Sequence, residues 1–134
     1  MALWRSPSSM KRQLPGTKMS DTKIYRYLDS QKKYPLDPEG YLVNQSEWDE
    51  SVAHLMAEEE GLTLTAEHWE VIKVVRAFYQ RYEMAPAMRP LVKATKNALG
   101  EEKGRSIYLM QLFPGSPAKR IARLAGLPKP TNCL

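Results

Sequence analysis

The chain has 134 residues, 43% hydrophobic and 26% charged, which predicts one domain with a buried core and excludes wholesale disorder. Its single cysteine excludes an internal disulfide, and the sequence predicts no structural metal site because only two histidines accompany that cysteine. The formal net charge of +5 is uneven, with +4 on residues 1–18, −6 on residues 19–65 and +7 on residues 66–134. This distribution suits either an anionic partner, such as RNA or an acidic protein, or solvated helix faces.

Residues 1–18 are expected to be a disordered basic extension, because serine, proline, glycine and basic residues occur there without a hydrophobic period. A more protein-like stretch opens at Met19, and two interpretations stay open: the native chain begins there, or it includes the extension. The sequence has no apolar run of the length that a signal peptide or a membrane span requires. It therefore predicts a cytoplasmic protein that does not enter the membrane.

Residues 24–43 have a strand-like pattern that is interrupted by two turns. The first turn is the polar stretch 29–31. The second is Asp37-Pro38-Glu39-Gly40, in which proline presets one turn position and glycine permits the exit. We expect a small hairpin or meander, too short to fold alone, that packs on the segments that follow it.

The first helix is expected to start at Ser46, because Ser46 and Asp49 have the spacing of a capping box. It carries Trp48 on its apolar face and ends at Gly61. Its last turn holds three glutamates, residues 58–60, which oppose the helix dipole. We expect them to form a solvated helix end, with a docking patch for a basic partner as the alternative.

The second helix is expected to be capped by Thr65, to run to Tyr82 and to be the central helix of the domain, because its apolar face is the broadest. His68 lies in its first turn. We expect a surface or core-edge histidine and not a general base, because the sequence identifies no cysteine, serine or carboxylate constellation around it.

Three shorter helices are expected to complete the body, at residues 91–99, 106–113 and 117–126. The exact start of the first is left open between Pro86 and Pro90, since proline fits a helix only in its first turn. Three consecutive short helices with basic residues resemble a helix-turn-helix motif. The same pattern occurs in many small helical domains, so direct sequence-specific DNA binding is not expected.

The predicted fold is therefore α+β and mostly α, with a small N-terminal β-hairpin packed on a bundle of about five short helices. Residues 19–125 are expected to form a single domain. Residues 126–134 are expected to form a mobile C-terminal arm that carries the cysteine.

The arm is the candidate active site because it carries Cys133. This cysteine is the second-to-last residue of the sequence and follows Gly126, Pro128 and Pro130. The prolines fix φ and favour extended backbone, which predicts a semi-stiff segment. At about 3.3 Å for each extended residue, the part of the chain after Gly126 could carry a thiol roughly 25 Å from the body.

A thiol reacts as the thiolate, and an unperturbed cysteine with a pKa near 8.5 is only slightly ionised at neutral pH. The terminal carboxylate disfavours ionisation of Cys133, whereas Lys129, Arg120 or Arg123 would favour it if the arm folds back onto them. Reactivity would then depend on where the arm is docked. The residues alone leave a second interpretation open, in which Cys133 is incidental in a frayed terminus.

Several short motifs run from Gly40 to the C-terminus: Gly40-Tyr41-Leu42, Glu60-Gly61-Leu62-Thr63-Leu64-Thr65, Glu67-His68-Trp69-Glu70-Val71, Pro86-Ala87, Leu91-Val92-Lys93-Ala94, Gly100-Glu101-Glu102-Lys103-Gly104, Leu112-Phe113-Pro114, Pro117-Ala118-Lys119 and Ala125-Gly126-Leu127-Pro128-Lys129-Pro130 before Cys133. Together they resemble the DsrC/TusE family of sulfur-carrier proteins. The resemblance covers most of the chain beyond the extension, and its last motif is the most specific.

The resemblance implies a small helical domain with an N-terminal hairpin and a mobile arm, and sulfur carried on Cys133 as a persulfide. DsrC proteins proper have a second cysteine at the position that Ala122 occupies here. Without it, Cys133 can exchange sulfur only with another molecule. This departure favours a role like that of the TusE proteins.

By the same resemblance, the protein is expected to be a sulfurtransferase that works without a cofactor. Its expected donor is a TusBCD-like persulfide complex, and its expected acceptor is a tRNA 2-thiouridylase with bound tRNA, for 2-thiolation of the wobble uridine. Two alternatives stay open: a DsrC-like binding partner of dissimilatory sulfite reductase, and a sulfur-responsive regulatory module that binds DNA. Ala122 argues against the sulfite-reductase alternative, because that role uses two cysteines.

Overall fold

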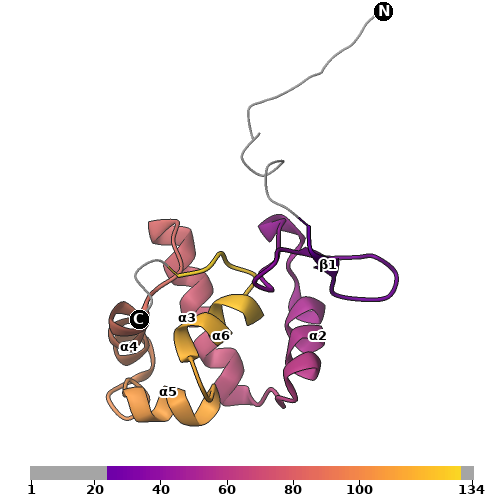
Figure 1. Cartoon of the computed structure of the whole chain (residues 1–134). Coiled ribbons are helices and arrows are strands. Elements are labelled where there is room, and N and C mark those ends of the chain that lie inside the picture. The colour runs from indigo at the N-terminus through magenta and orange to yellow at the C-terminus, as the bar shows by residue number, and fades with distance from the viewer. Residues whose placement is uncertain (1–23, 131–134) are drawn as a thin grey trace, which may run out of the picture.

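The computed structural model describes residues 24–130, as a short N-terminal hairpin beside a group of packed helices (Figure 1). The described part contains β1 (Arg26–Tyr27), β2 (Pro35–Leu36), the 3₁₀-helix η1 (Gln45–Glu47), α2 (Glu50–Glu60), α3 (Ala66–Tyr82), α4 (Met88–Leu99), α5 (Ser106–Leu112) and α6 (Pro117–Leu124). The predicted class, mostly helical with an N-terminal hairpin, is confirmed. The expected extension at residues 1–18 lies outside the described residues.

The hairpin is shorter than its sequence pattern predicts. β1 and β2 pair antiparallel with Arg26 opposite Leu36, and the expected third strand is reduced to a single bridge between Leu36 and Leu42. The turn between the strands is held by Asp29, whose Oδ1 accepts hydrogen bonds from the amides of residues 31 and 33, each at 3.0 Å. Pro35 has no N–H to donate, which limits the length of the ladder.

The start of the first helix differs from the prediction. α2 begins at Glu50, and its N-cap is Asp49, whose Oδ1 accepts a hydrogen bond of 3.2 Å from the amide of Val52. The capping box at Ser46 is not formed, so that prediction was wrong. Asp49 is itself a strong N-cap residue and takes the position that Ser46 was expected to hold. Trp48 consequently lies before the helix in extended backbone, with φ −67° and ψ 137°.

The acidic end of α2 was expected to be solvated, and for Glu60 this is wrong, whereas Glu58 and Glu59 are exposed. Glu59 accepts two hydrogen bonds of 2.8 Å from the guanidinium of Arg26 in β1. Glu60 lies against two arginines of α6, and its side chain is only 7% exposed. These cations offset the unfavourable position of the carboxylates at the negative end of the helix.

α3 is the central helix, as predicted, and begins after the N-cap residue Thr65. It packs on α4 and on α6, and α6 also packs on α2 (Figure 1). Large side chains that are fully buried between these elements form one core: Leu36, Met56, Ile72, Leu91, Leu109, Phe113, Ile121, Leu124 and Leu127. α6 is therefore surrounded by the other helices, and the segment that follows it emerges from the middle of the body.

Candidate functional site

The C-terminal segment begins in a buried turn at the end of α6. Gly126 has a φ of +73°, and the amide of Leu127 donates a hydrogen bond of 2.9 Å to the carbonyl of Ala122. Gly126 is buried, and Leu127 is only 2% exposed. Both residues were expected to belong to the extended arm, but the structure places them in the body, because Leu127 is apolar and joins the core. We call Leu124 to Leu127 the arm root.

Trp48 covers the arm root from the segment before α2. Its Nε1 donates a hydrogen bond of 2.8 Å to the carbonyl oxygen of Leu124. Its ring also lies directly against Gly126: a Cβ atom at that position would be 2.4 Å from Cδ1 of the indole. The arm root thus requires glycine twice, for its left-handed backbone and for its contact with Trp48.

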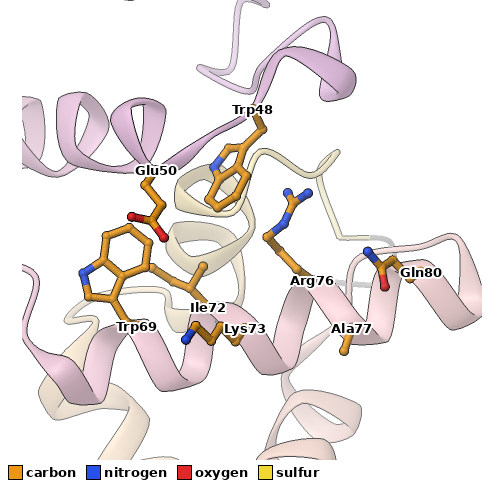
Figure 2. Close-up of a pocket in the computed structure, with 8 residues that line it drawn as sticks. All are labelled: Trp48, Glu50, Trp69, Ile72, Lys73, Arg76, Ala77 and Gln80. Carbon is orange, nitrogen blue, oxygen red and sulfur yellow. The ribbon is translucent and has the colours of Figure 1, made fainter.

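Arg76 holds the next carbonyl of the arm root from α3. Its Nη1 donates a hydrogen bond of 2.6 Å to the oxygen of Ala125, and its guanidinium carbon lies 3.9 Å from the centre of the Trp48 ring (Figure 2). Burial lowers the pKa of Arg76 below its ordinary value, which still leaves the guanidinium charged at neutral pH. The last carbonyls of a helix have no hydrogen-bond donors within the helix. Here two side chains from distant parts of the chain donate to these carbonyls.

The predicted arm residues that the structure describes lie against the body. Nζ of Lys129 is 2.8 Å from a carboxylate oxygen of Glu39, in the turn after β2. Pro128 is half-buried and Pro130 is buried. Cys133, the predicted reactive residue, lies outside the described residues.

Arg120 and Arg123, the predicted docking arginines, are brought together around Glu60. Nε of Arg120 is 3.0 Å from one carboxylate oxygen, and Nη2 of Arg123 is 2.7 Å from the other. Burial raises the pKa of Glu60, and the two guanidinium groups oppose that rise. Both arginines are thus committed to an internal ion-pair cluster, and a contact with the arm remains a prediction.

Ala122 is 1% exposed on α6. It occupies the position at which DsrC proteins proper were expected to have a second cysteine. The methyl group of Ala122 offers no chemistry, so the sequence contains no second thiol with which Cys133 could react.

His68 has a structural role. The amide of Thr65 donates to its Nδ1 at 3.0 Å, and its Nε2 lies 2.8 Å from the carbonyl oxygen of Leu112. An amide can only donate and a carbonyl can only accept, so the ring is neutral with its proton on Nε2. His68 therefore joins the start of α3 to the end of α5, and both of its nitrogens are occupied.

Sequence reasoning missed Trp48 and Arg76 as parts of the site. The sequence pattern predicts Trp48 on the apolar face of a helix, and it does not single out Arg76. Their partners lie 76 and 49 residues away in the sequence, so no local pattern marks the contacts. Within residues 24–130, no helix is long and apolar enough to cross a membrane, and no group of three His, Cys, Asp or Glu side chains could hold a metal ion.

Comparison with known proteins places this architecture in a family. Residues 29–134 match the model of the family described as DsrC like protein. The chain belongs to this DsrC-like family. The resemblance inferred from the sequence motifs is thereby confirmed, and the matched region extends through the C-terminal segment that contains Cys133.

Two similar curated proteins are named as sulfurtransferases. Sulfurtransferase TusE of Yersinia pseudotuberculosis is 54% identical over 98 residues, which cover 73% of this chain and 91% of that protein. Sulfurtransferase TusE of Escherichia coli K12 is 52% identical over 103 residues, which cover 77% and 94%. These relatives support the expected sulfurtransferase class and a sulfur-carrier role for this protein.

Solved structures of the family share the fold. The NMR structure of Allochromatium vinosum DsrC has a TM-score of 0.72 and 47% identity, covering 83% of this chain and 97% of that one. The crystal structure of the oxidized γ-subunit of dissimilatory sulfite reductase (DsrC) from Archaeoglobus fulgidus has a TM-score of 0.67 and 37% identity, covering 84% and 98%. The arrangement of α2 to α6 is therefore that of DsrC proteins.

Proposed function

We propose that this DsrC-like sulfurtransferase carries sulfur as a persulfide on Cys133 and relays it between two partner proteins. One observation carries the proposal: the family match runs to residue 134, and Cys133 is the only thiol in the chain. A carrier of persulfide sulfur needs a cysteine thiol, and Cys133 is the only cysteine in this sequence.

The transfer step exchanges one sulfur–sulfur bond for another. The thiolate of Cys133 attacks the outer sulfur of a donor persulfide, the bond within the donor persulfide breaks, and the donor cysteine leaves as a thiolate. Cys133 then bears the persulfide. The step needs no oxidant or reductant, because the oxidation states of the sulfur atoms are only redistributed. A second exchange of the same kind passes the outer sulfur to the acceptor.

The arm root gives this chemistry a fixed origin. Trp48 and Arg76 hold the carbonyls of Leu124 and Ala125, so the residues that lead to Cys133 start from a defined point and direction. Pro128 and Pro130 restrict the backbone that follows. A segment with fewer conformations loses less entropy when it enters the active site of a partner.

The proposed donor is a TusBCD-like persulfide complex, and the proposed acceptor is a cytoplasmic tRNA 2-thiouridylase with bound tRNA. The relatives named sulfurtransferase TusE support this relay for a protein with one cysteine. Ala122 argues against a role as partner of a sulfite reductase, since that role uses two cysteines in one chain.

Mass spectrometry tests the carrier role. Wild-type protein is incubated with glutathione persulfide, the terminal peptide is isolated, and one added sulfur atom is expected on it. A Cys133→Ser protein should gain none. If this variant still relays sulfur to an acceptor, or if wild-type protein takes up none, Cys133 is not the carrier.

A deletion strain tests the destination of the sulfur. Loss of the gene should lower 2-thiouridine at the wobble position of tRNA, and the wild-type gene should restore it, whereas the gene for the Cys133→Ser protein should not. Unchanged thiolation would assign the carrier to another sulfur pathway.

A further inference from the structure

A groove beside the arm root lies between the N-terminal end of α2 and one face of α3 (Figure 2). Its volume is about 260 Å³, and it is partly open to solvent. Its walls include Trp48, Glu50, Trp69, Ile72, Lys73 and Arg76. Trp48 and Arg76 are also the two residues that hold the arm root, so one pair of side chains belongs to both features.

Two opposite charges of the groove have no partner among residues 24–130. Glu50 enters from the first turn of α2 and Lys73 from α3, and neither forms an ion pair or a hydrogen bond through its side chain within that part of the chain. Both residues are exposed. Arg76, in contrast, is committed to Ala125 and to the ring of Trp48. The groove thus offers an acidic and a basic contact on either side of an apolar space.

The apolar space is formed by the rings of Trp48 and Trp69 with Ile72 between them. Cofactor and small-molecule pockets usually have volumes of about 300–1,000 Å³, so about 260 Å³ suits one large side chain better than a whole cofactor. Tryptophan and arginine are the residues that most often dominate the binding energy of protein interfaces. A nucleic acid fits less well, because its phosphates would meet the carboxylate of Glu50.

The length of the arm requires a partner to touch the body. Pro130 is buried, and Cys133 follows three residues later. Three extended residues span about 10 Å, so a partner that reaches the thiol must approach the surface of the body around Pro130. The groove lies beside the start of the same C-terminal segment, since Trp48 and Arg76 contact Leu124 and Ala125 from its wall.

We propose that this groove is the docking site for the protein that donates persulfide sulfur to Cys133. The donor inserts one apolar side chain between Trp48 and Trp69 and presents a carboxylate to Lys73. This inference rests on the proposed function, because it assumes that Cys133 accepts sulfur. The acceptor is a poorer occupant, since it brings bound tRNA toward Glu50.

Two variants block the groove without touching the arm root. Lys73→Glu reverses the charge that meets the donor, and Ala77→Gln fills the groove from an exposed position of α3 that lines it. Matched controls are Lys93→Glu and Ala98→Gln, at exposed positions of α4. All four changes lie on exposed helix positions. Where urea unfolding shows that Ala77→Gln does not fold, Lys73→Glu alone decides the test.

The experiment measures loading of Cys133 from two sources. The purified TusBCD-like donor complex of the same organism needs a docking surface, and glutathione persulfide does not. With the donor complex, Lys73→Glu and Ala77→Gln should raise the half-saturating donor concentration at least about tenfold, as expected for loss of one central interface contact, with an unchanged maximal rate. With glutathione persulfide, all variants should load at the wild-type rate.

The outcomes separate the two proposals. If wild-type protein is not loaded by glutathione persulfide, the carrier function itself fails. If it is loaded but the groove variants use the donor complex like wild type, or lose no more than the α4 controls, the docking site is wrong. An effect of Lys73→Glu confined to transfer onto the thiouridylase would assign the groove to the acceptor instead. Binding of single-stranded RNA that changes tryptophan fluorescence in a Trp4→Phe protein and is lost in Lys73→Glu would assign it to RNA.

Discussion

The indole nitrogen of Trp48 donates a hydrogen bond of 2.8 Å to the carbonyl oxygen of Leu124, which lies 76 residues further along the chain. Arg76 makes the corresponding contact of 2.6 Å with the carbonyl of Ala125. The carbonyls of Leu124 and Ala125 at the end of α6 are therefore capped by side chains from the segment after η1 and from α3. Because the segment that leads to Cys133 starts at this helix end, the position from which the arm starts depends on residues far from it in the sequence.

Trp48→Phe is expected to lower the free energy of unfolding by about 1–2 kcal/mol, because it leaves the buried carbonyl of Leu124 without its donor while keeping an aromatic ring beside Arg76. Urea unfolding at neutral pH measures the loss. Trp69→Phe is the matched control, since the indole nitrogen of Trp69 makes no hydrogen bond in the described part of the chain. Equal losses in the two variants would contradict the capping role of Trp48.

Gly126→Ala is expected to destabilise the protein by at least about 2 kcal/mol, through an unfavourable φ and an overlap with Trp48. Gly61→Ala isolates the first effect: Gly61 has a φ of +68°, close to the +73° of Gly126, but a Cβ atom there would meet no atom within 4 Å. Gly61→Ala should therefore cost about 1 kcal/mol. The difference between the two midpoints in urea measures the overlap, and no difference would show that the Trp48 ring moves aside without cost.

The elements that could be predicted from the sequence are those with local signals. Thr65 caps α3, Gly61 and Gly100 end α2 and α4, and Pro117 opens α6, all as expected. The start of α2 could not be fixed, because two residues near Trp48 both qualify as N-caps and only the packing decides between them. The hydrophobic period predicts Trp48 as a helix residue, whereas in the structure its ring packs on the arm root and donates a hydrogen bond to the carbonyl of Leu124.

The site was predicted only in part, for a related reason. The motif before Cys133 predicts the family, which the comparison confirms, and the resemblance predicts Cys133 as the reactive residue. The contacts of Arg76 and Trp48 pair residues from three separate segments, and no residue type or spacing marks them. The acidic end of α2 shows the same limit. The sequence predicts solvated side chains for Glu59 and Glu60, but in the structure Glu59 pairs with Arg26 and Glu60 pairs with two arginines of α6.

Glu60→Gln is expected to lower the free energy of unfolding by about 2–3 kcal/mol, because it leaves Arg120 and Arg123 close together without their carboxylate. The estimate lies below the usual cost for a fully buried pair because both arginines keep some contact with solvent. Glu58→Gln is the matched control in the same helix turn, at an exposed position with no ion pair among the described residues, and should change stability by less than about 0.5 kcal/mol. Similar effects of the two changes would mean that the cluster around Glu60 adds no stability.

The pair formed by Arg26 and Glu59 predicts a pH dependence. Two hydrogen bonds of 2.8 Å from Arg26 lower the pKa of Glu59 below its ordinary value of 4.5. A carboxyl whose pKa is lower in the folded state contributes stability that is fully present above its unfolded pKa and is lost as the pH falls through its folded pKa. The contribution should be less than about 1 kcal/mol, because solvent screens this half-exposed pair. Urea unfolding of wild type and Glu59→Gln should therefore differ at pH 7 and converge well below pH 4.5, whereas a difference that persists in acid would have to come from packing.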